Sequence, residues 1–266
     1  MRTIRVAMLL AAWSAVPASG EEMVSLRTRD GVTQAYLLVV PEGAIARGVA
    51  ILFPGAGGAI RLRVEDGRTK FGPNNFLVRS RHEFARRGMV AAIVDAPSDQ
   101  LAGMSDEFRS GSDHARDMEG VLGDLRKRFP SLPIYLVGTS RGTVSTGYLG
   151  KAIGPGVAGV VFTSAIYLAA GRGAAVKPGL TGFDFSSIRS RVLIVHHEND
   201  GCRFTPYSEA QKLAPRFPLI TVKGGRPAES DPCEPFSEHG FFGKEPETVD
   251  AIARWMSGES FPKTID

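Results

Sequence analysis

The chain has 266 residues, of which 43% are hydrophobic and 23% charged, and this is the composition of an ordinary globular protein. Its net charge of +4 is small and its 32 basic residues are scattered, which argues against nucleic acid as a partner. The two cysteines lack the paired spacing of a zinc site, and nothing else in the sequence calls for a metal or a cofactor.

Residues 1–20 have the pattern of a secretory signal peptide. Arg2 and Arg5 precede the apolar run VAMLLAAW, and small residues follow it, so cleavage is expected after Gly20. The run is shorter than the ~20 residues that span a bilayer, and no other segment is suited to do so. We therefore expect an exported protein, periplasmic or secreted, whose mature part (residues 21–266) is a single domain without a membrane span.

The mature part begins with a hairpin pattern and then alternates between strand and helix patterns. Asp30 and Gly31 separate two apolar runs in residues 23–40. Further strands are expected, in chain order, at residues 48–55, 89–97, 133–138, 157–165, 191–197 and 219–225. Helices are expected between them at residues 74–87, 113–129, 141–150 and 205–213, and after them at residues 247–256. This order predicts an α/β fold: a mostly parallel central sheet, helices on both faces and an antiparallel hairpin at its start.

The segment YLVGTSRGT contains the pattern G-x-S-x-G, formed by Gly138, Ser140 and Gly142. The pattern alone is weak, but here it directly follows a predicted strand and directly precedes a predicted helix. That setting is typical of a nucleophile elbow, in which a sharp turn lifts the serine oxygen above the edge of the sheet. The alternative interpretation is that Ser140 only caps the helix.

A serine nucleophile needs a general base and an acid that orients it, and the sequence offers both after Ser140. Asp200 follows the predicted strand at residues 191–197, and His239 lies in the loop after the last predicted strand. In its order of elements and in these three motifs, the chain resembles the α/β-hydrolase superfamily. The resemblance implies that Ser140 is the nucleophile, Asp200 the acid and His239 the base. Glu198 and, more weakly, Asp231 remain rivals of Asp200.

The resemblance also implies where an oxyanion would be bound. One backbone N–H should come from Arg141, and the other from the loop FPGAGG, with Ala56 as the donor and Gly57 as the alternative. His114, at the start of a predicted helix, and His197 are possible substrate contacts. The Arg141 side chain is expected either to meet an anionic substrate or to form a salt bridge.

The two cysteines flank the predicted acid and base. Cys202 lies two residues after Asp200 and Cys233 six residues before His239. Because an exported chain with only two cysteines favours a disulfide, we expect a Cys202–Cys233 bond that ties these two loops together. The alternative is two unpaired thiols.

These features predict an exported serine hydrolase that is similar to carboxylesterases. It would act on a small-molecule acyl substrate through an acyl-enzyme on Ser140, cleaving an ester, with a thioester or an amide as alternatives. An acyltransferase with the same triad and a catalytically silent binding protein on this fold remain alternatives. The segment from Ser164 to Ser190 is too short for a large cap, and this favours a small open site over a lipase-type one.

Overall fold

The computed structural model describes residues 21–43, 45–72, 75–168 and 179–266. The expected signal peptide lies outside these ranges, as do residues 169–178 of the segment in which a cap would be inserted. Within them, the helices are α1 (Phe76–Arg79), α2 (Arg81–Arg86), α3 (Asp106–Ser110), α4 (Ser112–Arg128), α5 (Gly142–Ile153), α6 (Tyr207–Leu213) and α7 (Glu245–Met256).

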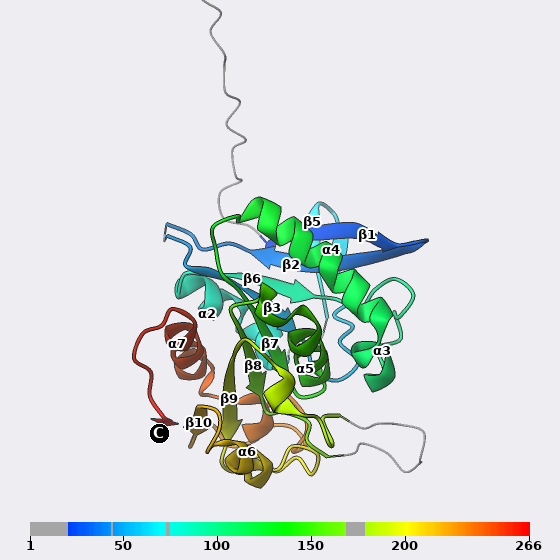
Figure 1. The fold of residues 1–266 in the computed structure, drawn as a ribbon. Helices are drawn as coiled ribbons and strands as arrows, with labels where there is room; N and C mark the ends of the chain where they lie inside the picture. Colours follow the sequence, from blue (N-terminus) through cyan, green and yellow to red (C-terminus); the bar gives the residue numbers. More distant parts are fainter. Residues whose placement is uncertain (1–20, 44, 73–74, 169–178) are drawn as a thin grey trace, which may run out of the picture.

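A central sheet organises the described part of the chain (Figure 1). In the order β1-β2-β6-β3-β7-β8-β9-β10-β11, its strands are Glu21–Arg29, Val32–Val39, Met89–Val94, Gly48–Phe53, Ile134–Thr139, Gly159–Thr163, Arg191–His197, Leu219–Val222 and Thr264–Ile265. The first two strands form the predicted antiparallel hairpin, and β2 runs antiparallel to β6. From β6 to β11 every neighbouring pair is parallel. The predicted fold class is therefore confirmed.

Side chains alternate across the sheet and form a separate core on each face. In β3, Ala50 and Leu52 pack with α1, α2 and α7, whereas Val49, Ile51 and Phe53 face the opposite core, which α4, α5 and α6 cover. The helices of both layers are visible in Figure 1. Because burial on both faces removes polar positions from these strands, their sequences read as continuous apolar runs.

Some elements differ from the sequence-based predictions. The helix expected at residues 74–87 is divided at Ser80, which leaves the helical conformation between α1 and α2. Pro206 occupies the N-cap of α6, so this helix begins two residues later than expected. The small hairpin of β4 (Arg63–Glu65) and β5 (Arg68–Lys70), helix α3 and the short edge strand β11 were not predicted, because each is too short to show a periodic pattern.

Candidate active site

Ser140 lies in a strained turn between β7 and α5. Its φ is +50°, a left-handed conformation that costs a non-glycine residue about 1–3 kcal/mol. The flanking residues must be glycines: a Cβ at Gly138 would lie 2.2 Å from the Thr146 hydroxyl, and one at Gly142 would lie 2.0 Å from the Phe53 carbonyl oxygen. The turn therefore has the geometry of a nucleophile elbow, with the serine at the carboxyl end of a central strand.

Asp200 lies in the acid loop (residues 198–206), directly after β9. Its carboxylate is fully buried and accepts hydrogen bonds from the Cys202 N–H (2.9 Å) and the Thr205 hydroxyl (2.9 Å). Nδ1 of His239 lies 3.0 Å from the carboxylate oxygen that also binds Thr205. Glu198, the rival acid, instead lies near Lys223, at 3.9 Å. The structure thus pairs His239 with Asp200.

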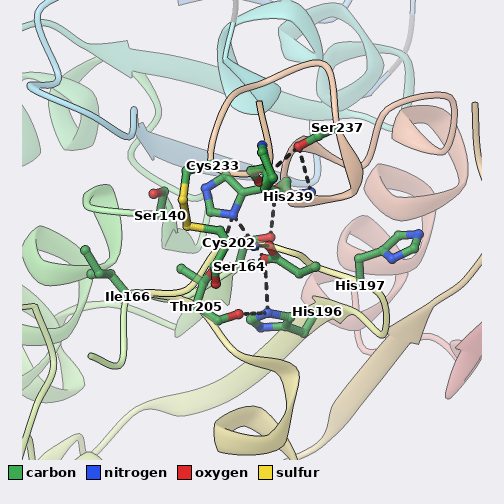
Figure 2. Close-up of polar contacts among 12 residues, drawn as sticks. Ser140, Ser164, Ile166, His196, His197, Cys202, Thr205, Cys233, Ser237 and His239 are labelled. Atoms are coloured by element: carbon green, nitrogen blue, oxygen red, sulfur yellow. Dashed lines mark hydrogen bonds and ion pairs between the residues drawn. A yellow bond between two sulfur atoms is a disulfide. The ribbon is translucent and has the colours of Figure 1, made fainter. Parts of the chain in front are cut away.

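A second histidine approaches the same carboxylate. Nε2 of His196 is 2.8 Å from the Thr205 carbonyl oxygen and 3.2 Å from Asp200, and since a carbonyl only accepts, this nitrogen carries the proton (Figure 2). Burial alone would raise the pKa of Asp200, but hydrogen bonds from His196 and His239 outweigh it and hold that pKa well below its usual range. Asp200 therefore stays ionised beside His239.

His239 lies in the base loop (residues 223–244), and its backbone is held on both sides. Ser164, a residue with φ of +42° just after β8, donates its hydroxyl to the His239 carbonyl oxygen at 2.8 Å. The Ser237 hydroxyl accepts the His239 N–H at 3.3 Å and donates to the Glu234 carbonyl oxygen. The imidazole is consequently fixed through its main chain as well as through Asp200 (Figure 2).

The structure contains the expected disulfide. Cys202 of the acid loop is bonded to Cys233 of the base loop, and the sequence separation is 31 residues. The bond therefore joins the loop that carries Asp200 to the loop that carries His239 (Figure 2).

Ser140 and His239 line one cavity of about 510 Å³, a volume typical of small-molecule sites. Both cysteines of the disulfide also line it, as do Phe76, Ile166 and Phe204. Its remaining wall includes residues 54–61 of the glycine loop, which is defined as residues 54–62 after β3. The site is thus a largely apolar pocket with a serine and a histidine on its surface.

The three backbone N–H groups expected as oxyanion donors all lie at this cavity. Within the described ranges, the N–H groups of Ala56, Gly57 and Arg141 have no hydrogen-bond acceptor, and all three residues line the cavity. The Arg141 side chain is not available in the same way, since it binds the buried carboxylate of Asp106 at 2.9 Å. Of the two expectations for this side chain, the structure has the salt bridge.

The two histidines expected as possible substrate contacts lie away from the cavity. His114 is completely buried between the rings of Phe53 and Phe108, because α4 turns it toward the core. His197 binds the Gly224 carbonyl oxygen at 2.8 Å, and Figure 2 shows its ring turned away from Ser140 and His239. Neither lines the cavity. Both expectations are corrected on this geometry.

The roles of several residues of the site were not predicted from the sequence. Thr205 and Ser164 are ordinary hydroxyl residues, but Thr205 follows the loop after the predicted strand at residues 191–197, and Ser164 lies at the carboxyl end of the one predicted at residues 157–165. Functional groups gather at such ends in parallel sheets. Asp95 also directly follows a strand, β6, and its buried carboxylate accepts the N–H groups of Ile60 (2.7 Å) and Leu62 (2.7 Å) in the glycine loop. Its place at the carboxyl end of a strand was the only feature of the sequence that could have indicated a role for Asp95.

Comparisons with solved structures identify the fold. Est1E from Butyrivibrio proteoclasticus has a TM-score of 0.60 at 14% identity, covering 88% of this chain and 97% of that one. A dienelactone hydrolase from Anabaena variabilis has a TM-score of 0.58 at 15% identity, covering 91% and 97%. A thermostable carboxyl esterase from Bacillus coagulans has a TM-score of 0.56 at 10% identity, covering 89% and 98%. The chain therefore has the α/β-hydrolase fold.

At the level of sequence, no model of a known protein family matches the chain, and no curated protein does. Among the described residues, no helix is long and apolar enough to cross a membrane. The same residues hold no group of three or more histidine, cysteine or acidic side chains arranged to bind a metal ion.

Proposed function

From the α/β-hydrolase fold and the geometry of this cavity, we propose that the chain is a serine hydrolase that cleaves an ester bond through an acyl-enzyme on Ser140. The observation that carries the proposal is the conjunction of a strained serine turn with a buried His239–Asp200 pair at one cavity. The solved neighbours include a carboxyl esterase and a dienelactone hydrolase, and this favours an ester over a thioester or an amide.

In this mechanism, His239 removes the proton of the Ser140 hydroxyl as its oxygen attacks the substrate carbonyl carbon. The Asp200 carboxylate accepts the Nδ1–H of His239, which leaves Nε2 as the proton acceptor and stabilises the imidazolium that forms. The proton then passes to the leaving alkoxide, and the acyl group stays on Ser140. Water, activated by the same imidazole, releases the acid and restores the serine.

The negative charge on the substrate oxygen requires preorganised donors. The free N–H of Arg141, the residue after the nucleophile, is suited to this role, and the glycine loop would supply the second through Ala56 or Gly57. The protein's own residues are sufficient for this chemistry, so the proposal includes no cofactor and no metal.

We also propose that the mature protein, residues 21–266, is a single exported domain, periplasmic or secreted, after removal of residues 1–20. The Cys202–Cys233 disulfide supports export, since such bonds persist in oxidising compartments.

The experiment is to treat the purified mature protein with a fluorophosphonate probe, map the modified peptide, and assay a panel of small esters, thioesters and amides. Labelling confined to Ser140, turnover of short esters and loss of both in Ser140→Ala are expected. Label on another serine of an active protein would contradict the proposal.

Adding alcohols or amines to the assay separates hydrolysis from acyl transfer, because an acyltransferase would form the new ester or amide in preference to the free acid. A binding protein would show neither label nor turnover.

A further inference from the structure

An arginine lies buried directly beneath the glycine loop. Arg109, from α3, is 1% exposed. Its Nη2 donates to the carbonyl oxygens of Ala56 (3.2 Å) and Pro54 (3.4 Å), and its Nη1 donates to the hydroxyl of Ser145 on α5 at 2.9 Å. Its Nε has no hydrogen-bond partner in the described part of the protein. The guanidinium is therefore used mainly to hold the glycine loop by its carbonyl groups.

No carboxylate neutralises this arginine. Asp106, which lies on the same helix, uses its carboxylate for the Arg141 side chain and the Gly179 N–H. The described residues place no acid within ion-pair distance of Arg109, and the sequence outside the described ranges contains no aspartate or glutamate. Burial lowers the pKa of Arg109 to about 9, with a further lowering by the charge of Arg141 that Asp106 opposes, so the side chain is still charged at neutral pH. Such an unpaired charge inside a protein is costly and needs a reason.

The contacts of Arg109 determine where the loop's N–H groups point. In a trans peptide the carbonyl and the following N–H face opposite directions, and the described chain has no cis peptide bond. A carbonyl of Ala56 that is held by Arg109 therefore turns the Gly57 N–H away from the guanidinium. The Gly58 N–H donates to the Gly55 carbonyl at 2.9 Å. Because this carbonyl and the Ala56 N–H belong to one peptide unit, the bond also fixes the direction of the Ala56 N–H. Both candidate donors thus depend on carbonyls that are held in place.

The packing between Arg109 and the loop leaves no free space. A Cβ on Gly58 would lie 2.5 Å from Nη2 of Arg109 and 2.6 Å from Cε of Met104, and Gly58 has a φ of +71° that also favours glycine. The close fit of guanidinium and loop therefore constrains the position of the loop backbone.

We propose that Arg109 is a positioning residue for the oxyanion: it fixes the Gly57 N–H donor through the Ala56 carbonyl and holds the start of the glycine loop through the Pro54 carbonyl, and its unpaired charge favours the negative charge that develops on the substrate oxygen. This inference rests on the proposed ester hydrolysis at Ser140. Both effects act on the transition state more than on the bound ester, because the charge exists only in the former. The substrate itself does not touch Arg109.

The test uses Arg109→Lys and Arg109→Met in the mature protein, with kcat and KM measured on the best small ester. Binding of a trifluoromethyl ketone is compared with binding of the matching methyl ketone. The serine oxygen adds to the carbonyl of the trifluoromethyl ketone, and the adduct carries an oxyanion. We expect kcat to fall about 10–100-fold in Arg109→Met, below the 10²–10³-fold typical of a lost direct donor, with little change in KM. Affinity for the trifluoromethyl ketone should fall in parallel, and that for the methyl ketone should not. Arg109→Lys, which keeps the charge, should lose less.

Arg191→Met is the matched control, since Arg191 also donates to a main-chain carbonyl, that of Trp255, but lies at the opposite end of the sheet. If Arg109→Met does not fold, Arg109→Lys and Ser145→Ala, which removes the Nη1 acceptor, provide the same comparison. Unchanged kcat and unchanged trifluoromethyl ketone affinity in a folded variant would overturn the inference about Arg109 and leave the proposed ester hydrolysis standing. Equal weakening of both ketones would also overturn it, because a purely structural role predicts that result. A wild-type protein that is neither labelled at Ser140 nor active on esters would instead overturn the proposed function, and the inference with it.

Discussion

The two sides of the cavity are held in place by different means. On one side, the acid loop and the base loop are bound to each other, by the Cys202–Cys233 disulfide and by the hydrogen bonds that converge on Asp200. On the other side, the glycine loop makes no covalent link and is held by two buried groups of opposite charge. Asp95 accepts its N–H groups, and Arg109 donates to its carbonyl oxygens.

The difference follows from what each side must position. The acid and base loops present side chains, whose relative placement is improved by linking their backbones directly. The glycine loop presents backbone N–H groups, and a peptide dipole can be oriented by holding its carbonyl end or a neighbouring N–H. Small displacements of such groups have large effects on rate, so both arrangements favour preorganisation.

The largest expected effect is a fall in kcat when the hydrogen bond between Asp200 and His239, which joins the two linked loops, is altered. Asp200→Asn should lower kcat about 10⁴-fold, because the asparagine cannot hold the required tautomer of His239 or stabilise its imidazolium. Glu198→Gln, two residues away and facing Lys223, is the matched control and should be close to wild type. The measurement is steady-state hydrolysis of a short ester. A larger loss at Glu198 than at Asp200 would assign the acid to Glu198.

The covalent link should contribute next. Replacing both Cys202 and Cys233 by alanine should lower the free energy of unfolding by roughly 3–4 kcal/mol, since the bond closes a loop of about 31 residues. Urea unfolding followed by tryptophan fluorescence measures this. Under mild reduction of the wild type, activity should fall before global unfolding, because the loops of Asp200 and His239 separate first. Activity that is retained until the protein unfolds would show that the disulfide does not position the pair.

On the glycine-loop side, Asp95→Asn should lower the free energy of unfolding by about 2–3 kcal/mol, because the amide replaces a buried carboxylate that accepts N–H groups of Ile60, Arg61 and Leu62. The exposed Asp184, which caps a short helical turn, is the control, and Asp184→Asn should be nearly neutral because asparagine is also a good cap. Equal stability of the two variants in urea unfolding would remove Asp95 from the account of how this loop is held.

The last expected effect is absent at neutral pH and appears only in acid, and it concerns His114, whose ring packs against Phe53 at the end of β3. Burial lowers the pKa of His114 to about 3, helped by the charges of Arg109 and Arg29, and neither ring nitrogen has a partner among the described residues. The unfolded chain binds this proton near pH 6.5 and the folded chain only near pH 3, so stability is full above pH 6.5 and falls as the pH drops between these values, by about 1.4 kcal/mol per unit.

Substituting His114→Leu should remove this contribution to acid sensitivity. The variant and the wild type should therefore differ in the slope of unfolding free energy against pH between 6.5 and 3, and not above pH 7. Parallel slopes would mean that His114 is not the buried neutral histidine described above.

The sequence was sufficient for the parts of the molecule that depend on pattern. Three local patterns predicted the sheet, the hairpin and the serine turn that the structure has. These patterns are the continuous apolar strands, the Asp30-Gly31 pair and the glycines around Ser140. The loops that carry Asp200 and His239 could also be located, because the carboxyl ends of parallel strands meet at one edge.

What the sequence could not supply depends on tertiary contacts. Nothing near Arg109 indicates that an arginine on a five-residue helix is buried without an acid, and nothing near His196 indicates that it reaches Asp200. His114 was expected to face a substrate because it begins a helix at the sheet's carboxyl side. The rotation of α4 against Phe53, which decides its direction, is fixed only by packing.

The acyl-enzyme is the central claim, and it can be observed directly. The mature protein is mixed with an activated acetyl ester, quenched in acid within the burst phase, digested and mapped by mass spectrometry. One acetyl group is expected on the peptide that contains Ser140, and none there in Ser140→Ala. Turnover of the ester without acetyl on Ser140, or with the acetyl group on another residue, would contradict it.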